Sequence, residues 1–405
     1  MKKTLIINTT FSKGGAARIA QSLYGDFKKA PEFSSYFTYG RGSKRKEEKV
    51  FKFSFFPEVF FHGMLTRLTG LQGHGSYFST KRLEKFILKE KFVLIHLHNL
   101  HGYYLNLSFV KFLGKLNIPI IWTLHDAWPI TGRCSYFLDC NRWKSGCWDC
   151  PNLSWYPKTY FDSSAFMWKR KREAFNSGWN PVIVCPSEWL ADQVRESYLA
   201  KFKIEVIPNG INTEIFKPKD KTEIRKRLRV DLNKKIILFV ADKLTDERKG
   251  AKYFFEALNY IKNENWQVLT LGSKFGLVKN DKIKELGYVS NLNFISDVYN
   301  AADLFCTTAI DESFGLTTTE SMACGVPVVG FRTGGIQEQV SEKCGIIVDK
   351  KNTKKLAVAI EELLNNNQKR KESGLNCREK VLRNYSIEKF KQQYMDLYET
   401  LLIKR

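Results

Sequence analysis

The sequence predicts an α/β protein built from two Rossmann-like, doubly wound domains that face each other across a cleft. Its 405 residues exceed what one ordinary hydrophobic core accommodates. Short, continuous apolar runs recur along the whole chain, and such runs are typical of strands buried in a parallel sheet. Most of the runs are followed by a loop and then by helical periodicity, which is the alternation of an α/β fold.

The first half opens on a β-branched run at residues 2–10, which leads into the double glycine of "FSKGGAARIAQSL" and then into helical periodicity. This order predicts a strand, a tight loop and a helix. Similar apolar runs predict further strands at 92–99, 118–126 and 181–187. We therefore expect a first domain over residues 1–190.

In the second half the strand pattern restarts near residue 204, and the chain between 188 and 220 is rich in Pro, Asn, Gly and Lys, as expected for a domain linker. Residues from 353 onward show helical periodicity with little strand signal. We expect a second domain over 191–386 and a C-terminal helix over 387–405. The strands expected after the restart are 204–210, 235–242, 266–273, 303–309 and 327–331.

Positive charge is concentrated in the first half. The net charge is +23, and residues 1–180 hold 28 basic but only 12 acidic residues. Nucleic acid, an anionic membrane surface or a phosphorylated substrate would each suit such a surface, and a basic surface without a single partner is the alternative. Without a run of 18 apolar residues or the pattern of a signal peptide, we expect a cytoplasmic protein with no membrane span.

Four of the nine cysteines lie in the segment "CSYFLDCNRWKSGCWDC", at Cys134, Cys140, Cys147 and Cys150. Four thiolates in a tetrahedral array suit a structural zinc ion, and the C-x2-C pair favours it, although the other spacings differ from those of standard zinc ribbons. One or two disulfides and four unpaired thiols are the alternatives. A crosslink of either kind would fix the loop 134–150.

Residues 51–65, "FKFSFFPEVFFHGML", are rich in phenylalanine within this basic half of the chain. Aromatic and basic residues together suit docking on the surface of an anionic bilayer. A helix buried in the first domain explains the same composition equally well.

The phosphate-binding motifs of common nucleotide enzymes are missing. Neither "GRGSKR" nor "GHGSYF" completes the G-x-G-x-x-G fingerprint, and no G-x-x-x-x-G-K-[ST] loop occurs. This disfavours the usual nicotinamide and ATP enzymes. A ligand between two such domains would lie at the C-terminal ends of the strands, where helix N-termini present their amides.

The second half carries four segments in a fixed order, "VIPNGINTEIF", "DKLTDERKG", "DESFGLTTTESMACGVPVVGF" and "TGGIQEQV". This series resembles the retaining glycosyltransferases of the GT-B fold in the large family-four group. The segments "GGAARIA", "HLHNLHG" and "TLHDAWPITGRC" of the first half look like the branch that builds bacterial cell-surface polysaccharides. The resemblance covers nearly the whole chain, and implies an acceptor-side first domain, a second domain that binds a nucleotide sugar, and a C-terminal helix that packs back on the first domain.

In similar enzymes an E-x7-E segment holds the donor, and Glu312 and Glu320 match it. The resemblance implies that Glu312 accepts hydrogen bonds from hydroxyls of the donor sugar and that Glu320 binds the ribose. The backbone amides of Phe314, Gly315 and Leu316, at the start of the next helix, would approach the sugar and the phosphates. Solvated carboxylates around a helix start are the alternative.

The diphosphate needs positive charge, and no D-x-D metal motif occurs in the chain. Lys249 matches the lysine that precedes a glycine in the family, and Lys243 lies where the family usually has arginine. Lysine there gives a point charge in place of the bidentate fork of an arginine. We expect these cations to act without a catalytic metal, whereas ordinary surface lysines are the alternative.

In the first half, Gly14 and Gly15 resemble the family's flexible loop near the donor phosphates, although a plain tight turn explains them too. His125, after an apolar run, matches a histidine that lines the catalytic cleft and bonds the donor sugar, with a core histidine as the alternative. His98 ends the preceding strand and could contact the acceptor.

The resemblance therefore implies transfer of a sugar from a nucleoside diphosphate to a hydroxyl of a glycan or lipid-linked acceptor, with retention of configuration, by a protein in the cytoplasm or at the inner face of the membrane. Two other readings remain open at this point. A basic nucleic-acid-binding protein would bind DNA or RNA with a strong salt dependence. A sugar epimerase or a phosphorylase could share the fold.

Overall fold

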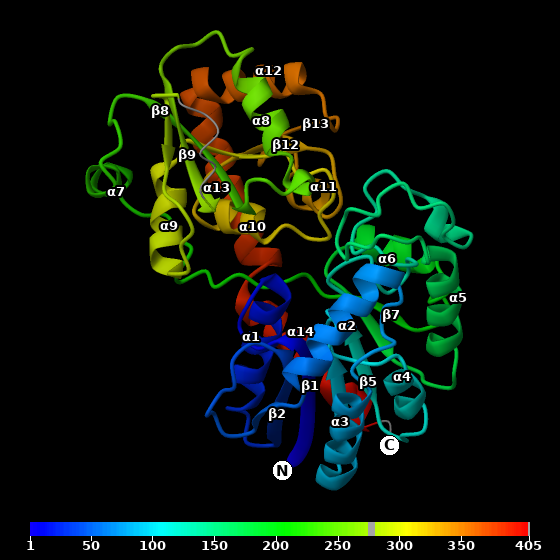
Figure 1. Ribbon diagram of the computed structural model, residues 1–405. Coiled ribbons are helices and arrows are strands. Elements are labelled where there is room, and N and C mark those ends of the chain that lie inside the picture. Colours follow the sequence, from blue (N-terminus) through cyan, green and yellow to red (C-terminus); the bar gives the residue numbers. More distant parts are fainter. Residues whose placement is uncertain (274–279, 404–405) are drawn as a thin grey trace. The chain divides into compact units, whose positions relative to one another are not determined.

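The computed structural model describes residues 1–273 and 280–403 and divides them into two compact units. The first unit comprises Met1–Ile207 together with the chain from Lys391 onward, and the second comprises Pro208–Phe390 (Figure 1). The first unit thus continues beyond the expected boundary at residue 190. Each unit is a parallel sheet covered by helices, which confirms the predicted fold class.

The sheet of the first unit is parallel throughout, with the strand order β3-β2-β1-β4-β5-β6-β7. The order runs outward in both directions from β1 and β4, so the crossovers reverse between these two strands, as in doubly wound folds. Its strands are β1 (Lys2–Thr10), β2 (Phe33–Arg41), β3 (Val50–Lys52), β4 (Leu94–Leu97), β5 (Ile120–Thr123), β6 (Val182–Cys185) and β7 (Ile204–Val206).

Helices cover this sheet, and apolar side chains between residues 83 and 87, 109 and 113, and 190 and 194 form its core with the strands. They are α1 (Gly15–Phe27), α2 (Phe56–Thr69), α3 (Tyr77–Glu90), α4 (Ser108–Leu113), α5 (Ser164–Phe175) and α6 (Glu188–Arg195), with a 3-10 turn η1 (Arg142–Lys144).

The second unit has a six-stranded parallel sheet in the order β10-β9-β8-β11-β12-β13. Its strands are β8 (Lys235–Lys243), β9 (Trp266–Ser273), β10 (Ile283–Glu285), β11 (Leu304–Thr307), β12 (Val328–Phe331) and β13 (Gly345–Val348). Its helices are α7 (Lys221–Arg227), η2 (Glu247–Lys249), α8 (Ala251–Leu258), α9 (Leu292–Ala301), α10 (Leu316–Ala323), α11 (Ile336–Gln339), α12 (Thr353–Asn365) and α13 (Asn367–Asn384).

The strand expected at 204–210 belongs to the first sheet, although the sequence suggested that it opens the second domain. In β7, Ile204 pairs with Ile183 and Val206 with Cys185 of β6. The apolar run looks the same in either sheet, and only the pairing decides its membership. The linker therefore begins after Ile207.

The last helix, α14 (Ile387–Ile403), belongs to the first unit from Lys391 onward. The Tyr394 hydroxyl lies 2.8 Å from Thr123 Oγ1, and the Tyr398 hydroxyl lies 2.9 Å from His96 Nδ1. The Tyr398 ring also stacks on Phe27 at 4.1 Å between centroids. Two buried tyrosines thus attach this helix to β4, β5 and α1. Over the described ranges, no helix has both the length and the apolar character needed to cross a bilayer.

Candidate functional site

The loop between β11 and α10 carries the first carboxylate of the E-x7-E segment, and α10 carries the second. Gly315 forms the N-cap of α10 with φ 95°, a left-handed conformation that glycine adopts without strain. The first N–H groups of a helix have no partner inside that helix. The turn therefore presents backbone amides at the carboxyl edge of the second sheet, where parallel α/β folds bind ligands.

Glu312 is the anionic centre of this edge. Its Oε2 accepts a hydrogen bond from Arg248 Nη1 at 3.1 Å and a second one from the Lys249 ammonium. Burial alone would raise the pKa of Glu312, but the charges and hydrogen bonds of Lys249 and Arg248 outweigh it and lower the pKa to about 2. Glu312 is therefore a carboxylate at any pH near neutrality.

Lys249 ends the 3-10 turn η2, directly before Gly250, whose left-handed φ of 68° begins α8. Burial lowers the pKa of Lys249, and the negative charge of Glu312 opposes that shift. A cation is thus held in a partly buried setting, where it interacts more strongly with an anion than it would in water.

Arg248 was not among the residues predicted from the sequence. Besides Glu312, its guanidinium donates to the carbonyl oxygen of Asp311 at 3.2 Å. Its one signal in the sequence was its neighbour Lys249, because the resemblance singled out Lys243 and Lys249 in this segment but not Arg248. The two-cation arrangement around Glu312 depends on the conformation of η2.

The "TGG" segment, residues 333–335, packs against the backbone of the loop that carries Glu312. Gly335 N–H donates to the carbonyl oxygen of Glu312 at 3.0 Å. Gly334 has φ 45°, and a Cβ atom at this position would lie 1.8 Å from the same oxygen. Gln339 Nε2 donates to the carbonyl oxygen of Phe314 at 2.7 Å. Glycine at 334 is thus required for this close approach.

Glu320, in the middle of α10, is buried, with 3% of its surface exposed. Its Oε2 accepts a hydrogen bond from the Tyr299 hydroxyl at 3.1 Å, so α9 helps to orient it. Lys243, in contrast, is exposed at the end of β8. The ion pairs of Glu312 in the described part of the chain are with Lys249 and Arg248, so Lys243 does not belong to this cluster.

The candidate residues of the first unit lie at the ends of two of its strands. Gly14 is the N-cap of α1 with φ 91°, and no atom lies within 4 Å of the position that its Cβ would take. Gly15 is the first residue of α1. Backbone conformation, rather than lack of space, is therefore the reason for glycine at 14.

His125 follows β5 and is hydrogen-bonded through Nε2 to His98 Nδ1 at 2.9 Å. Its neighbour Asp126 accepts from His101 Nε2 at 2.8 Å. His98 is completely buried, so the expectation that it contacts an acceptor is wrong. Its position after a strand suggested an accessible residue, but its ring packs between those of His96 and His125.

Neutral histidines in the first unit predict a loss of its stability in mild acid. Burial lowers the pKa of His62 and His125 from 6.5 to about 4 and that of His96 to about 3. Below pH 6.5 these histidines therefore become protonated in the unfolded chain, whereas they stay neutral in the folded unit. As the pH falls from 7 to 5, each such histidine should lower the free energy of unfolding by about 2 kcal/mol.

This prediction can be checked by thermal unfolding followed through tryptophan fluorescence, because eight of the nine tryptophans belong to the first unit. The midpoint should fall steeply from pH 7 to pH 5. The carboxylate of Glu312, with a pKa of about 2, contributes no such change in the second unit over that range. A flat midpoint would contradict the assignment of neutral buried histidines.

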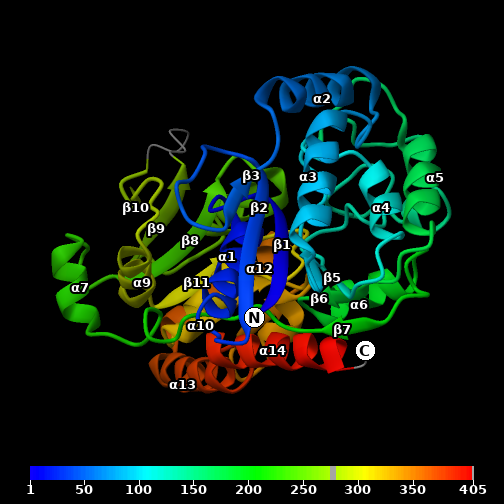
Figure 2. The ribbon, with the colours of Figure 1, turned by 90° about the horizontal axis from the view of Figure 1, so that it is seen from below.

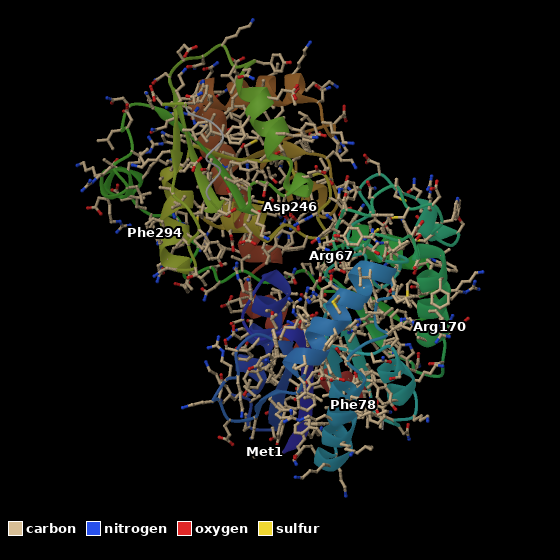
Figure 3. The ribbon with its side chains drawn as sticks, viewed as in Figure 1. Met1, Arg67, Phe78, Arg170, Asp246 and Phe294 are labelled. Atoms are coloured by element: carbon tan, nitrogen blue, oxygen red, sulfur yellow. The ribbon has the colours of Figure 1, made fainter. Side chains whose placement is uncertain are left out.

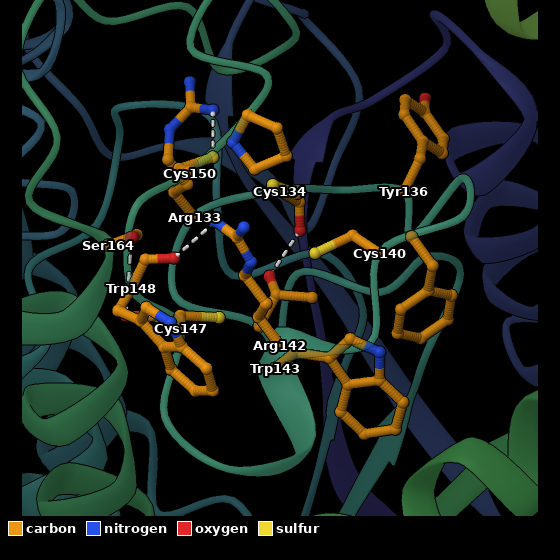
Figure 4. Close-up of a pocket in the computed structure, with 13 residues that line it drawn as sticks. Arg133, Cys134, Tyr136, Cys140, Arg142, Trp143, Cys147, Trp148, Cys150 and Ser164 are labelled. Atoms are coloured by element: carbon orange, nitrogen blue, oxygen red, sulfur yellow. Dashed lines mark hydrogen bonds between the residues drawn. The ribbon is translucent and has the colours of Figure 1, made fainter.

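The four clustered cysteines line one cavity in the loop between β5 and α5, together with Arg133, as Figure 4 shows. Gly132 N–H donates to Cys147 Sγ at 3.1 Å, and Arg133 Nη1 lies 3.7 Å from Cys150 Sγ. A hydrogen bond from the Cys134 thiol lowers the pKa of Cys150 to about 6, and the same bond raises that of Cys134. Burial raises the pKa of Cys147 to about 11.

The cysteines are unpaired, and among the described residues no group of three or more His, Cys, Asp or Glu side chains has the geometry to hold a metal ion. Zinc binding would thus require the loop to draw its thiols together, and it stays a prediction.

If zinc binds there, the protein purified without chelators contains one zinc per chain, measured by elemental analysis, and Cys147→Ser/Cys150→Ser removes it. Cys324→Ser, at a buried cysteine of the second unit, serves as the control and should keep the metal. The prediction would be contradicted if wild-type protein, produced in cells grown with added zinc, contained no zinc.

Two family descriptions cover most of the chain. Residues 13–215 match Glycosyltransferase Family 4, and residues 220–380 match Glycosyl transferases group 1. The first match spans half of the chain, and the second includes the Glu312 cluster and α10.

Individual proteins are similar over nearly the full length. The putative colanic acid biosynthesis glycosyl transferase WcaC of Escherichia coli K12 is 26% identical, with 87% of this chain and 88% of that protein covered. The solved structure of sucrose-phosphate synthase from Thermosynechococcus elongatus covers 100% of both chains at 18% identity, with a TM-score of 0.76. HepE of Anabaena, in complex with UDP-glucose, is 16% identical with a TM-score of 0.69, covering 99% of this chain and 100% of that chain. Family matches and fold agree: this chain is a glycosyltransferase of the family-four group with the GT-B fold.

Proposed function

We propose that this glycosyltransferase moves a hexose-type sugar from a nucleoside diphosphate sugar to a hydroxyl of a glycan or a lipid-linked acceptor, with retention of configuration, in the biosynthesis of a cell-surface polysaccharide. The observation that carries the proposal is the partly buried cluster of Glu312, Lys249 and Arg248 beside the start of α10.

The donor would contact this edge at three points. Lys249 and the amides of Phe314, Gly315 and Leu316 would neutralise the diphosphate, because a helix N-terminus and a partly buried cation both favour anions. Glu312, ionised at neutral pH, would accept hydrogen bonds from sugar hydroxyls. Glu320 would take the ribose hydroxyls, with Tyr299 holding its carboxylate in place.

In the transfer step the bond between the anomeric carbon and the β-phosphate oxygen breaks, and a bond to the acceptor oxygen forms on the same face of the sugar. The departing phosphate oxygen takes the proton of the acceptor hydroxyl, so no separate base is needed. The leaving diphosphate gains negative charge as the bond breaks. Lys249 would stabilise that charge in a partly buried site, where it has the largest effect.

The assignments in the first unit rest on the resemblance. His125 would donate to or accept from the donor sugar as a neutral imidazole, because its pKa is lowered to about 4. Gly14 and Gly15 would lie near the phosphates, where their backbone conformation allows close approach. Lys243 would make a weaker contact with the donor, because it is exposed at the end of β8.

The names of similar proteins support the substrate classes. WcaC is described as a colanic acid biosynthesis enzyme, and HepE has been solved with UDP-glucose. The first name agrees with a polysaccharide acceptor, and the second agrees with a nucleotide-sugar donor.

The test is to incubate the purified protein with a panel of UDP-, GDP- and ADP-sugars and to measure release of nucleoside diphosphate and a shift in the unfolding midpoint. At least one donor should be hydrolysed slowly in water, and addition of EDTA should leave the rate unchanged, because Lys249 takes the place of a divalent ion. Loss of turnover with EDTA and recovery with magnesium would contradict the metal-independent mechanism.

The same assay separates the other readings. An epimerase would change the donor sugar without releasing nucleoside diphosphate, and a phosphorylase would require inorganic phosphate. A nucleic-acid-binding protein would release nothing from any donor and would bind DNA or RNA with an affinity that falls steeply with salt.

A further inference from the structure

Helix α2 exposes most of its aromatic side chains to solvent, whereas the residues that it buries are polar. Phe56, Phe60 and Phe61 are 75%, 58% and 60% exposed. The buried positions of the helix are His62 and Thr66. The alternative of a buried aromatic helix is therefore contradicted by the structure.

Specific hydrogen bonds hold the inward face of α2 in place, and they thereby determine which residues the helix exposes. His62 Nε2 accepts from Gly73 N–H at 2.9 Å, and His62 Nδ1 lies 3.1 Å from Ser76 Oγ. The Thr66 hydroxyl donates to the carbonyl oxygen of Leu71 at 3.2 Å. Rotating the helix to bury its phenylalanines would break all three bonds.

The apolar surface continues beyond α2 at its two ends. Phe78, 71% exposed, lies beside the first turn, because its N–H donates to Glu58 Oε1 at 2.9 Å. Tyr160, 57% exposed, lies beside the last turn, because its N–H donates to the carbonyl oxygen of Arg67 at 2.9 Å. Figure 2 shows α2 along the rim of the first unit beside α3, and Figure 3 labels Arg67 and Phe78.

Exposed cations alternate with these rings. The Arg67 guanidinium lies 5.5 Å and the Lys158 ammonium 6.0 Å from the centre of the Tyr160 ring. The Arg82 guanidinium lies 5.2 Å from the Phe55 ring. The carboxylate on α2, Glu58, is already engaged by the backbone of Phe78 and by Ser79 at the start of α3. The surface is therefore both aromatic and positively charged.

We propose that α2, with the flanking Phe78 and Tyr160, docks the protein on an anionic lipid bilayer. Aromatic side chains partition into the boundary between headgroups and acyl chains, while Arg and Lys beside them attract anionic headgroups. A second copy of this chain fits less well, since a symmetric contact would bring the same positively charged surface of both copies together. The inference stands apart from the sugar-transfer chemistry, because it uses none of the donor-site residues.

Sedimentation of the full chain with vesicles tests this surface. The protein should bind vesicles of phosphatidylcholine with 30% phosphatidylglycerol, bind pure phosphatidylcholine much less, and release from the anionic vesicles as salt is raised. Phe60→Ser/Phe61→Ser should lower the affinity for anionic vesicles by about ten-fold or more. Arg67→Gln/Lys158→Gln should reduce the preference for anionic lipid.

The matched control is Val358→Ser/Leu375→Ser, at exposed apolar residues of the second unit, and it should bind vesicles like the wild type. All of these positions are exposed, so each variant should unfold at the wild-type midpoint and hydrolyse donor at the wild-type rate. The proposal is overturned if the wild type does not bind anionic vesicles, or if Phe60→Ser/Phe61→Ser binds them as well as the control. It is equally overturned if the wild type is a dimer that this variant converts to monomer while neither sediments with vesicles.

Discussion

Replacing Lys249 with methionine is expected to lower kcat/KM for sugar transfer by about 10²- to 10³-fold. Methionine keeps most of the length of the side chain and removes its charge. The leaving diphosphate then loses the cation that is held beside Glu312 in a partly buried position. Steady-state release of nucleoside diphosphate measures the effect.

Lys252→Met is the matched control, because Lys252 is an exposed lysine three residues further along, in α8. It should retain the wild-type rate. Lys249→Met removes one of two partners of Glu312, and Arg248 remains to pair with that carboxylate. The variant should therefore fold, as its unfolding midpoint will show. If the Lys249→Met protein folds and keeps the wild-type kcat/KM, Lys249 does not stabilise the leaving diphosphate.

Replacing Gly334 with alanine is expected to destabilise the second unit by about 3 kcal/mol or more and to abolish donor binding. Its φ of 45° disfavours any L side chain, and the added Cβ would lie 1.8 Å from the carbonyl oxygen of Glu312. Backbone cannot yield as a flexible side chain does, so the loop that carries Glu312 must move. Denaturant unfolding and calorimetric titration with the preferred donor measure the two effects.

Gly287→Ala separates the clash from the backbone strain. Gly287 has φ 74°, yet nothing lies within 4 Å of the position of its Cβ. This variant should lose only the strain, about 1 kcal/mol, and bind donor normally. Equal losses of stability in the two variants would show that the approach of Gly334 to Glu312 does not matter.

The sequence predicted the two parallel α/β units because their central strands are continuous apolar runs, and β1, β4, β5 and β6 all follow such runs. It missed β2, where Ser, Thr and Tyr interrupt the apolar residues, although the strand is mostly buried. It also placed β7 in the wrong unit. Strand membership is a property of pairing between distant segments, which periodicity does not contain.

At the candidate site the sequence placed Glu312 in a loop and Glu320 on a helix, because both follow from the glycine at 315 and the run after it. It did not reveal that Glu312 pairs with Lys249 and Arg248, since the pairing depends on how η2 folds against the loop. Nor did it reveal the burial of His98, whose imidazole lies against His96 of β4 and against His125, which follows the neighbouring strand β5.

A crystal structure of the protein with a nucleotide sugar it hydrolyses tests the central claim most directly. The account predicts the diphosphate within hydrogen-bonding distance of Lys249 Nζ and the amides that begin α10, a ribose hydroxyl on Glu320, and sugar hydroxyls on Glu312. A nucleotide bound away from this edge of the second sheet, or with its phosphates on a divalent ion instead of Lys249, would contradict it.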